Sequence, residues 1–142
     1  MHSIFRSLAM ASALSLAACG SGADSDELTG LYDGIADSET ITLVGTEPFW
    51  SMEVSSESLT YSTPENPDGQ QTAITRFAGN GGLGVAGTLD GEPLQVAVTP
   101  GDCSDGMSDR IYPFTATASV GESTLFGCGY TDAQPFSGDQ AP

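Results

Sequence analysis

Apolar and polar side chains alternate along short segments of the chain from residue 41 onward. Successive side chains of a β-strand point to opposite faces of a sheet, so an alternation of period two predicts strands that are buried on one face only. The segments with this alternation, or with a short apolar run of strand length, are 50–54, 59–61, 85–88, 94–98, 114–120 and 124–126.

Turn signals separate these segments at short intervals. An Asp-Gly pair is typical of type I′ hairpin turns, and a leading glycine is typical of type II′ turns. Apart from the N-terminus, no window of a dozen residues shows the period of an amphipathic helix. We therefore predict an all-β fold of seven or eight antiparallel strands, closed into a small barrel or sandwich. The turn signals are Ser56-Glu57, Asn80-Gly81-Gly82, Asp90-Gly91 and Gly121-Glu122.

Residues 1–18 have the features of a lipoprotein signal peptide. A weakly basic start is followed by an apolar run over 7–18, which is shorter than the roughly 20 residues needed to cross a bilayer as a helix. Small residues precede Cys19 and a glycine follows it, as in a lipobox. We expect cleavage before Cys19 and lipidation of its thiol, and several acyl chains on one cysteine give firm membrane anchoring. An ordinary secretory signal with an incidental cysteine is the alternative.

The N-terminal signal also indicates a location. In the better-known enterobacterial sorting scheme, an aspartate after the lipidated cysteine holds a lipoprotein at the inner membrane. Here Gly20 stands at that position, so we expect the protein in the bacterial cell envelope, lipid-anchored at the outer membrane and facing the periplasm.

Composition divides the rest of the chain into three parts. Residues 19–39 are rich in Gly, Ser and Asp, which is typical of a flexible tether between a lipid anchor and a domain. Residues 40–130 contain the predicted strands and form the expected β-domain. Residues 131–142 have the composition of a frayed, disordered tail.

Net charge narrows the classes of function. After removal of residues 1–18, Arg76 and Arg110 are the only cations and stand against 19 acidic residues, a net charge of −17. Such a chain repels nucleic acids and anionic lipid headgroups and attracts cationic proteins and divalent metals. It would also lack His and Lys, which removes Ser-His-Asp and Cys-His catalysis, Schiff-base chemistry and imidazole metal sites. We therefore expect no enzyme, no cofactor and no nucleic-acid partner.

Two cysteines remain if the thiol of Cys19 carries lipid. In an oxidising envelope compartment, we predict that Cys103 and Cys128 form a disulfide. The alternative is a pair of free thiols in a redox or soft-metal site.

Three segments have unusual sequences for strands and loops of a small β-protein. They are 45–50 (GTEPFW), 102–113 (DCSDGMSDRIYP) and 125–129 (LFGCG). Together they resemble a family of bacterial envelope lipoproteins and predicted membrane proteins with GTEPFW, CSDGMSDRxYP and LxGC-type segments. The resemblance implies a small β-domain, an envelope location and paired cysteines, and it brings no catalytic residue. Such domains are loosely associated with lysozyme-inhibitor-like and META-type lipoproteins.

The acidic loop is open to two interpretations. Asp102, Asp105 and Asp109 lie within eight residues and offer oxygen ligands to a cation such as Ca²⁺, although their spacing is not that of an EF-hand. We favour a structural role, in which aspartate side chains cap their own turns and one of them pairs with Arg110. A glycosidase pair that includes Glu47 is disfavoured by the small size of the domain.

Adjacent aromatic residues suggest a contact surface. Phe49 and Trp50 must face opposite sides of a strand, and the alternation places Trp50 inside. Phe49, Met107 and Tyr112 are the candidate contacts for a partner. We predict a non-catalytic binding module for a cationic envelope protein, such as a lysozyme-like enzyme, or for a small ligand. The alternatives are a divalent-metal module that uses the acidic loop and a purely structural envelope protein.

Overall fold

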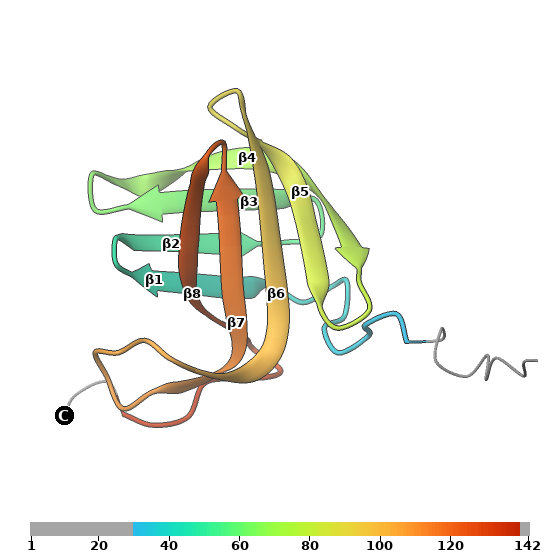
Figure 1. The fold of residues 1–142 in the computed structure, drawn as a ribbon, viewed down its shortest axis with the longest axis vertical. Helices are drawn as coiled ribbons and strands as arrows, with labels where there is room; N and C mark the ends of the chain where they lie inside the picture. The colour runs from blue at the N-terminus through green and yellow to red at the C-terminus, as the bar shows by residue number, and fades with distance from the viewer. Residues whose placement is uncertain (1–29, 140–142) are drawn as a thin grey trace, which may run out of the picture.

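The protein folds as a closed β-barrel in which every strand is antiparallel to its neighbours (Figure 1). The computed structural model describes residues 30–139, so the predicted signal peptide and Cys19 lie outside the described residues. The predicted all-β fold is confirmed, and the barrel is one of the two architectures that were expected. The strands are β1 (Ile41–Thr46), β2 (Phe49–Val54), β3 (Ser58–Thr63), β4 (Asn66–Ala78), β5 (Leu83–Leu89), β6 (Glu92–Ser104), β7 (Ile111–Val120) and β8 (Ser123–Thr131).

The chain runs as a meander in which each strand pairs with the next, and β8 returns to pair with β1. Figure 1 shows β5–β8 side by side in one layer, with β1–β3 crossing behind them. Within residues 30–139 no helix has the length and apolar character needed to cross a membrane.

The core fills the barrel with the inward side chains that the alternation selects. On β2, for example, Trp50, Met52 and Val54 are buried while Phe49 is exposed. Removing such apolar surface from water contributes roughly 25 cal/mol per Å² to folding. The side chains with 2 % exposure or less in this core are Ile41, Leu43, Met52, Val54, Leu59, Val85, Leu89, Leu94, Val98, Phe114, Ala116 and Ala118.

Two tight turns have the conformation that their residues predict. Asp90 and Gly91 connect β5 to β6 with φ of 53° and 82°, as a type I′ turn requires. Gly121 has a φ of 57° at the two-residue turn between β7 and β8, where a positive φ costs glycine little.

The sequence pattern did not reveal β4, which pairs with both β3 and β5. The strand begins with Asn66-Pro67-Asp68-Gly69, residues that are typical of turns. None of its thirteen residues is fully buried, and Ile74 is only partly covered by the core. The strand therefore lacks the strong apolar alternation that marks the other strands.

The expected flexible tether over 19–39 is wrong for its last residues. Ile35 is 4 % exposed and belongs to the core cluster. Arg76, on β4, holds the segment through its guanidinium, whose Nη1 donates to Glu39 O at 2.9 Å and whose Nη2 donates to Ala36 O at 3.2 Å. Residues 30–39 therefore form a strap that packs against the barrel, because one apolar side chain and several backbone carbonyls find partners there.

The expected disordered tail over 131–142 is wrong for the part that the structure describes. Thr131 ends β8, is buried, and donates from Oγ1 to Glu39 Oε2 at 2.6 Å. This bond and one from the Ala36 amide lower the pKa of Glu39. Farther along, the Phe136 ring packs on Tyr130 at a centroid distance of 5.0 Å. Aromatic packing and side-chain capping therefore order this segment, although its composition is polar.

We predict that Arg76→Ala lowers the free energy of unfolding by about 1–3 kcal/mol, because several hydrogen bonds from one charged group are lost together. Denaturant titration measures the change. Thr75→Ala, at the exposed neighbouring position on β4, should change stability by less than about 0.5 kcal/mol. Equal stability of the two variants would show that the hydrogen bonds of Arg76 to the strap contribute nothing to folding.

Candidate functional site

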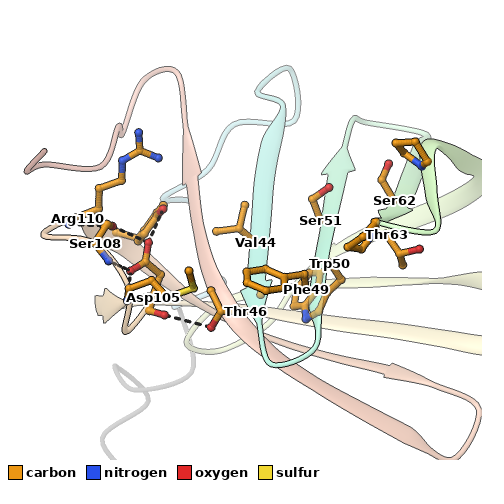
Figure 2. Close-up of a pocket in the computed structure, with 15 residues that line it drawn as sticks. Val44, Thr46, Phe49, Trp50, Ser51, Ser62, Thr63, Asp105, Ser108 and Arg110 are labelled. Atoms are coloured by element: carbon orange, nitrogen blue, oxygen red, sulfur yellow. Dashed lines mark hydrogen bonds between the residues drawn. The ribbon is translucent and has the colours of Figure 1, made fainter. Parts of the chain in front are cut away.

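A cleft of about 530 Å³ lies against the outer side of β1, β2 and β3 (Figure 2). Its floor includes one register row that crosses the three strands, in which Val44 pairs with Ser51 and Ser51 pairs with Ser62. These positions face outward because their neighbours along each strand fill the core. The floor is therefore built of small and medium side chains that leave room above the sheet.

The two walls of the cleft come from segments far apart in the sequence. The turn between β3 and β4 contributes Pro64 and Pro67 on one side. The loop between β6 and β7, residues 105–110, contributes the other side (Figure 2). Sequence reasoning missed the proline wall because it did not recognise β4. The signal was the turn sequence Pro64-Glu65-Asn66-Pro67 itself.

The β6–β7 loop is fastened to the barrel at two points. A disulfide joins Cys103 on β6 to Cys128 on β8, with Cα atoms 5.5 Å apart, so the predicted bridge is confirmed and the alternative of free thiols is wrong. In addition, Thr46 Oγ1 donates to Asp105 O at 3.1 Å. Closing a chain segment of this length stabilises a fold by roughly 3 kcal/mol on the chain-entropy estimate.

Asp105 organises the tip of the loop. Its Oδ1 accepts hydrogen bonds from the amides of Met107 and Ser108 at 2.9 and 2.8 Å. Its Oδ2 accepts from Ser108 Oγ at 2.7 Å and from Tyr112 Oη at 3.3 Å. These bonds, that from Ser108 Oγ first, lower the pKa of Asp105 to about 2. Gly106 completes the turn with a φ of 71°. Asp105 thus caps its own turn, as the structural interpretation of the loop predicts.

The other two aspartates of the loop do not converge on Asp105. Asp102 and Asp109 are both exposed. Across residues 30–139 the structure contains no group of three or more His, Cys, Asp or Glu placed to hold a metal ion. The carboxylate of Asp105 is also already engaged by four donors, which leaves it little capacity for a cation.

The three candidate contact residues all line this one cleft, although Phe49 lies far from Met107 and Tyr112 in the sequence. Phe49 is 53 % exposed and Met107 is 60 % exposed, so both present apolar surface at the rim. Tyr112 is only 3 % exposed, and the expectation that it offers contact surface is wrong. Its ring packs on Phe136 and its hydroxyl bonds Asp105, so Tyr112 supports the loop from below.

Trp50 forms the boundary between the cleft and the core. It is 4 % exposed, which confirms its predicted inward position. The indole lies so close over Gly45 that a Cβ there would overlap Nε1. Among the described residues, Nε1 has no hydrogen-bond partner. Only glycine at position 45 leaves space for the ring.

Three carboxylates lie in the turns and the loop that border the cleft. Glu47 lies in the turn between β1 and β2, Glu65 lies in the turn between β3 and β4, and Asp109 lies in the β6–β7 loop. All three are exposed. The one cation that lines the cleft, Arg110, places its guanidinium 4.2 Å from the centroid of the Phe136 ring. The cleft therefore combines apolar rim residues with mainly negative surroundings.

Comparison of the chain with protein-family models, with curated proteins and with solved structures finds no match.

We predict that Asp105 makes the stability of the protein depend on pH in strongly acidic solution. The pKa of Asp105 is about 2 in the folded protein, against an ordinary value of 3.8 that applies in the unfolded chain. The contribution of its carboxylate to the free energy of unfolding is therefore complete above pH 4 and is lost as the pH falls toward 2. Thermal unfolding at a series of pH values should show that Asp105→Asn lowers the Tm above pH 4 and much less near pH 2. The control Asp102→Asn removes an exposed carboxylate and should lower the Tm little at any pH. A Tm difference for Asp105→Asn that stays constant from pH 5 to pH 2 would contradict this assignment.

Proposed function

We propose that the protein is a lipid-anchored envelope protein whose barrel is a non-catalytic binding module for a cationic envelope protein. The observation that carries this proposal is the cleft, whose rim combines the exposed side chains of Phe49 and Met107 with surrounding carboxylates.

The charge of the barrel supports a cationic partner. Residues 30–139 contain only two arginines, Arg76 and Arg110, against sixteen acidic residues. Arg76 is occupied by backbone carbonyls of the strap, and Arg110 lies over Phe136. A surface potential of this sign accelerates encounter with basic proteins and repels acidic ones.

The shape of the cleft supplies specificity, which charge alone does not. A long-range field attracts many basic proteins, whereas a concave site with exposed apolar side chains accepts only a complementary surface. Phe49 begins β2 and Met107 lies on the β6–β7 loop, and both exposed side chains line the cleft. A side chain of the partner that packs on them loses contact with water, which slows dissociation.

The proposed anchor would hold the barrel close to the membrane. With lipid on Cys19, only residues 20–29 connect the anchor to the strap, and ten residues span at most about 35 Å when fully extended. The barrel would therefore meet its partner near the membrane surface, at the periplasmic side of the outer membrane under our location proposal. The family resemblance of the 45–50, 102–113 and 125–129 segments supports this envelope setting.

A small ligand is the second candidate for the cleft. Its volume of about 530 Å³ falls within the range of roughly 300–1,000 Å³ that is usual for small-molecule sites. Hydroxyl groups of Ser51, Ser62 and Thr63 line it and are available to orient a polar ligand. The metal-binding alternative has less support, because the three aspartates of the loop are not gathered around one point.

The binding proposal is tested by association and dissociation kinetics. The protein is measured against c-type lysozyme and against cytochrome c, a basic control, at low and at physiological salt. Higher salt should mainly slow association, whereas Phe49→Ala should speed dissociation from lysozyme about fivefold to tenfold, because it removes a large exposed apolar contact at the rim. Phe77→Ala, an equally exposed phenylalanine away from the cleft, is the matched control.

Two results would refute a specific cationic partner of this kind. One is equal affinity for both basic proteins that vanishes by about 150 mM salt, where the screening length is near 8 Å. The other is an identical dissociation rate for the Phe49→Ala and Phe77→Ala variants. The first would mean that the negative charge serves solubility only, and the second would mean that the cleft does not hold the partner through Phe49.

The anchor is tested separately by mass spectrometry of protein extracted from membranes. We expect loss of residues 1–18 and a mass increase on Cys19 from its acyl chains. Cys19→Ser should give a soluble or unprocessed form. An intact N-terminus or an unmodified Cys19 thiol would show that the protein is not a lipoprotein.

A further inference from the structure

A second concave surface lies on the outer side of β5–β7, apart from the cleft. It is a groove of about 370 Å³ bordered by Phe77, and none of its lining residues is ionisable. The two surfaces share no lining residue. In Figure 1 the strands β5–β8 form a single layer on the near side of the barrel.

This layer lacks charge in a strongly acidic chain. The strands β5, β7 and β8 contain no charged residue, and the two on β6, Glu92 and Asp102, lie at or near its ends. The carboxylates lie at the turns instead, for example Asp90 and Glu122. A ligand on this layer would therefore meet no counter-charge between the turns.

One register row crosses the layer and has an exposed aromatic residue at each end. Phe77 is 54 % exposed and Phe126 is 68 % exposed. Because a Cβ on Gly84 would overlap the Phe77 ring, that ring lies over the glycine and leaves its other side to solvent. Small side chains separate the two ends and keep the floor low. The row reads Phe77, Gly84, Ala97, Thr117 and Phe126.

Polar side chains lie in this register row and beside it. Gln95 pairs in register with Ser119, and Thr117 lies in the row itself. All three line the groove. Their side chains have no hydrogen-bond partner among the described residues, whereas most polar groups of the β6–β7 loop are engaged. One amide and two hydroxyls therefore remain available to a ligand.

We propose that this groove binds a neutral oligosaccharide. The C–H groups of a sugar ring can pack on the exposed Phe77 ring, because the face of an aromatic ring is partially negative. Sugar hydroxyls match the amide of Gln95 and the hydroxyls of Thr117 and Ser119, each of which can donate and accept. The absence of charged lining residues selects against ionic ligands.

Charge also decides against two other occupants. Anionic saccharides are repelled by a barrel that carries sixteen carboxylates. A second copy of the chain would bring Asp90 and Glu122 in the turns, and Glu92 at the start of β6, toward another equally acidic barrel. A neutral polyhydroxylated ligand meets neither of these electrostatic repulsions.

The test maps binding on the purified protein by NMR amide shifts. The probes are neutral tetrasaccharides of β-linked N-acetylglucosamine, β-linked glucose and α-linked glucose, with tetragalacturonate as the anionic control. We expect at least one neutral probe to shift amides of β5–β7 and tetragalacturonate to shift none of them. Phe77→Ala should weaken binding about tenfold, as expected for loss of one aromatic contact. Phe49→Ala, at the separate cleft, should leave the affinity unchanged.

Three outcomes would overturn the proposal. The first is the absence of shifts with every neutral probe at millimolar concentration. The second is shifts that map to the cleft and disappear in Phe49→Ala but not in Phe77→Ala. The third is reversible dimerisation in sedimentation experiments that Ala97→Glu abolishes, which would assign this layer to self-association. The first and third results leave the lysozyme experiment unaffected, because Phe49 and Phe77 report on different surfaces, whereas the second would assign a small ligand to the cleft.

Discussion

The pairing of β8 with β1 is the constraint on which the rest of the structure depends. It closes the barrel, so that each of the described strands pairs with a neighbour on both sides along at least part of its length. The register places Val44 opposite Cys128, so the cysteine faces outward where the β6–β7 loop can be bridged to it. That bridge sets one wall of the cleft beside β1. Closure also brings Thr131 to Glu39, which joins the segments before and after the barrel.

Much of the architecture follows from local signals that agree with one another. Asp90-Gly91 specifies a tight hairpin by its backbone preferences, and the structure has that turn. Alternation on β2 separates Trp50 from Phe49 because a strand has only two faces. The disulfide followed from counting the cysteines available in an oxidising compartment. Such features depend on a few adjacent residues or on elimination, so the sequence alone predicts them well.

The remaining features depend on contacts between distant residues. Ile35 lies in a polar, glycine-containing segment, and it is buried because Arg76 holds that segment against the barrel and the side chain joins the core cluster. Tyr112 follows a polar loop, yet it is covered by Phe136 from a segment with the composition of a tail. The cleft needs the β3–β4 turn and the β6–β7 loop on either side of one sheet. No local sequence pattern encodes these long-range contacts, which form because the barrel closes.

The strap has a mechanical consequence for a chain that is held at its N-terminus. Under the proposed lipid anchor, tension would reach the hydrogen bonds of Arg76 and the buried Ile35 before it reached β1. These contacts can break one after another. In contrast, β1 is hydrogen-bonded along both of its sides, so many of its bonds must break together. Release of ten residues lengthens the connection by up to about 35 Å. With the proposed anchor on Cys19, the segment would therefore act as an extensible link that detaches under load while the barrel stays folded.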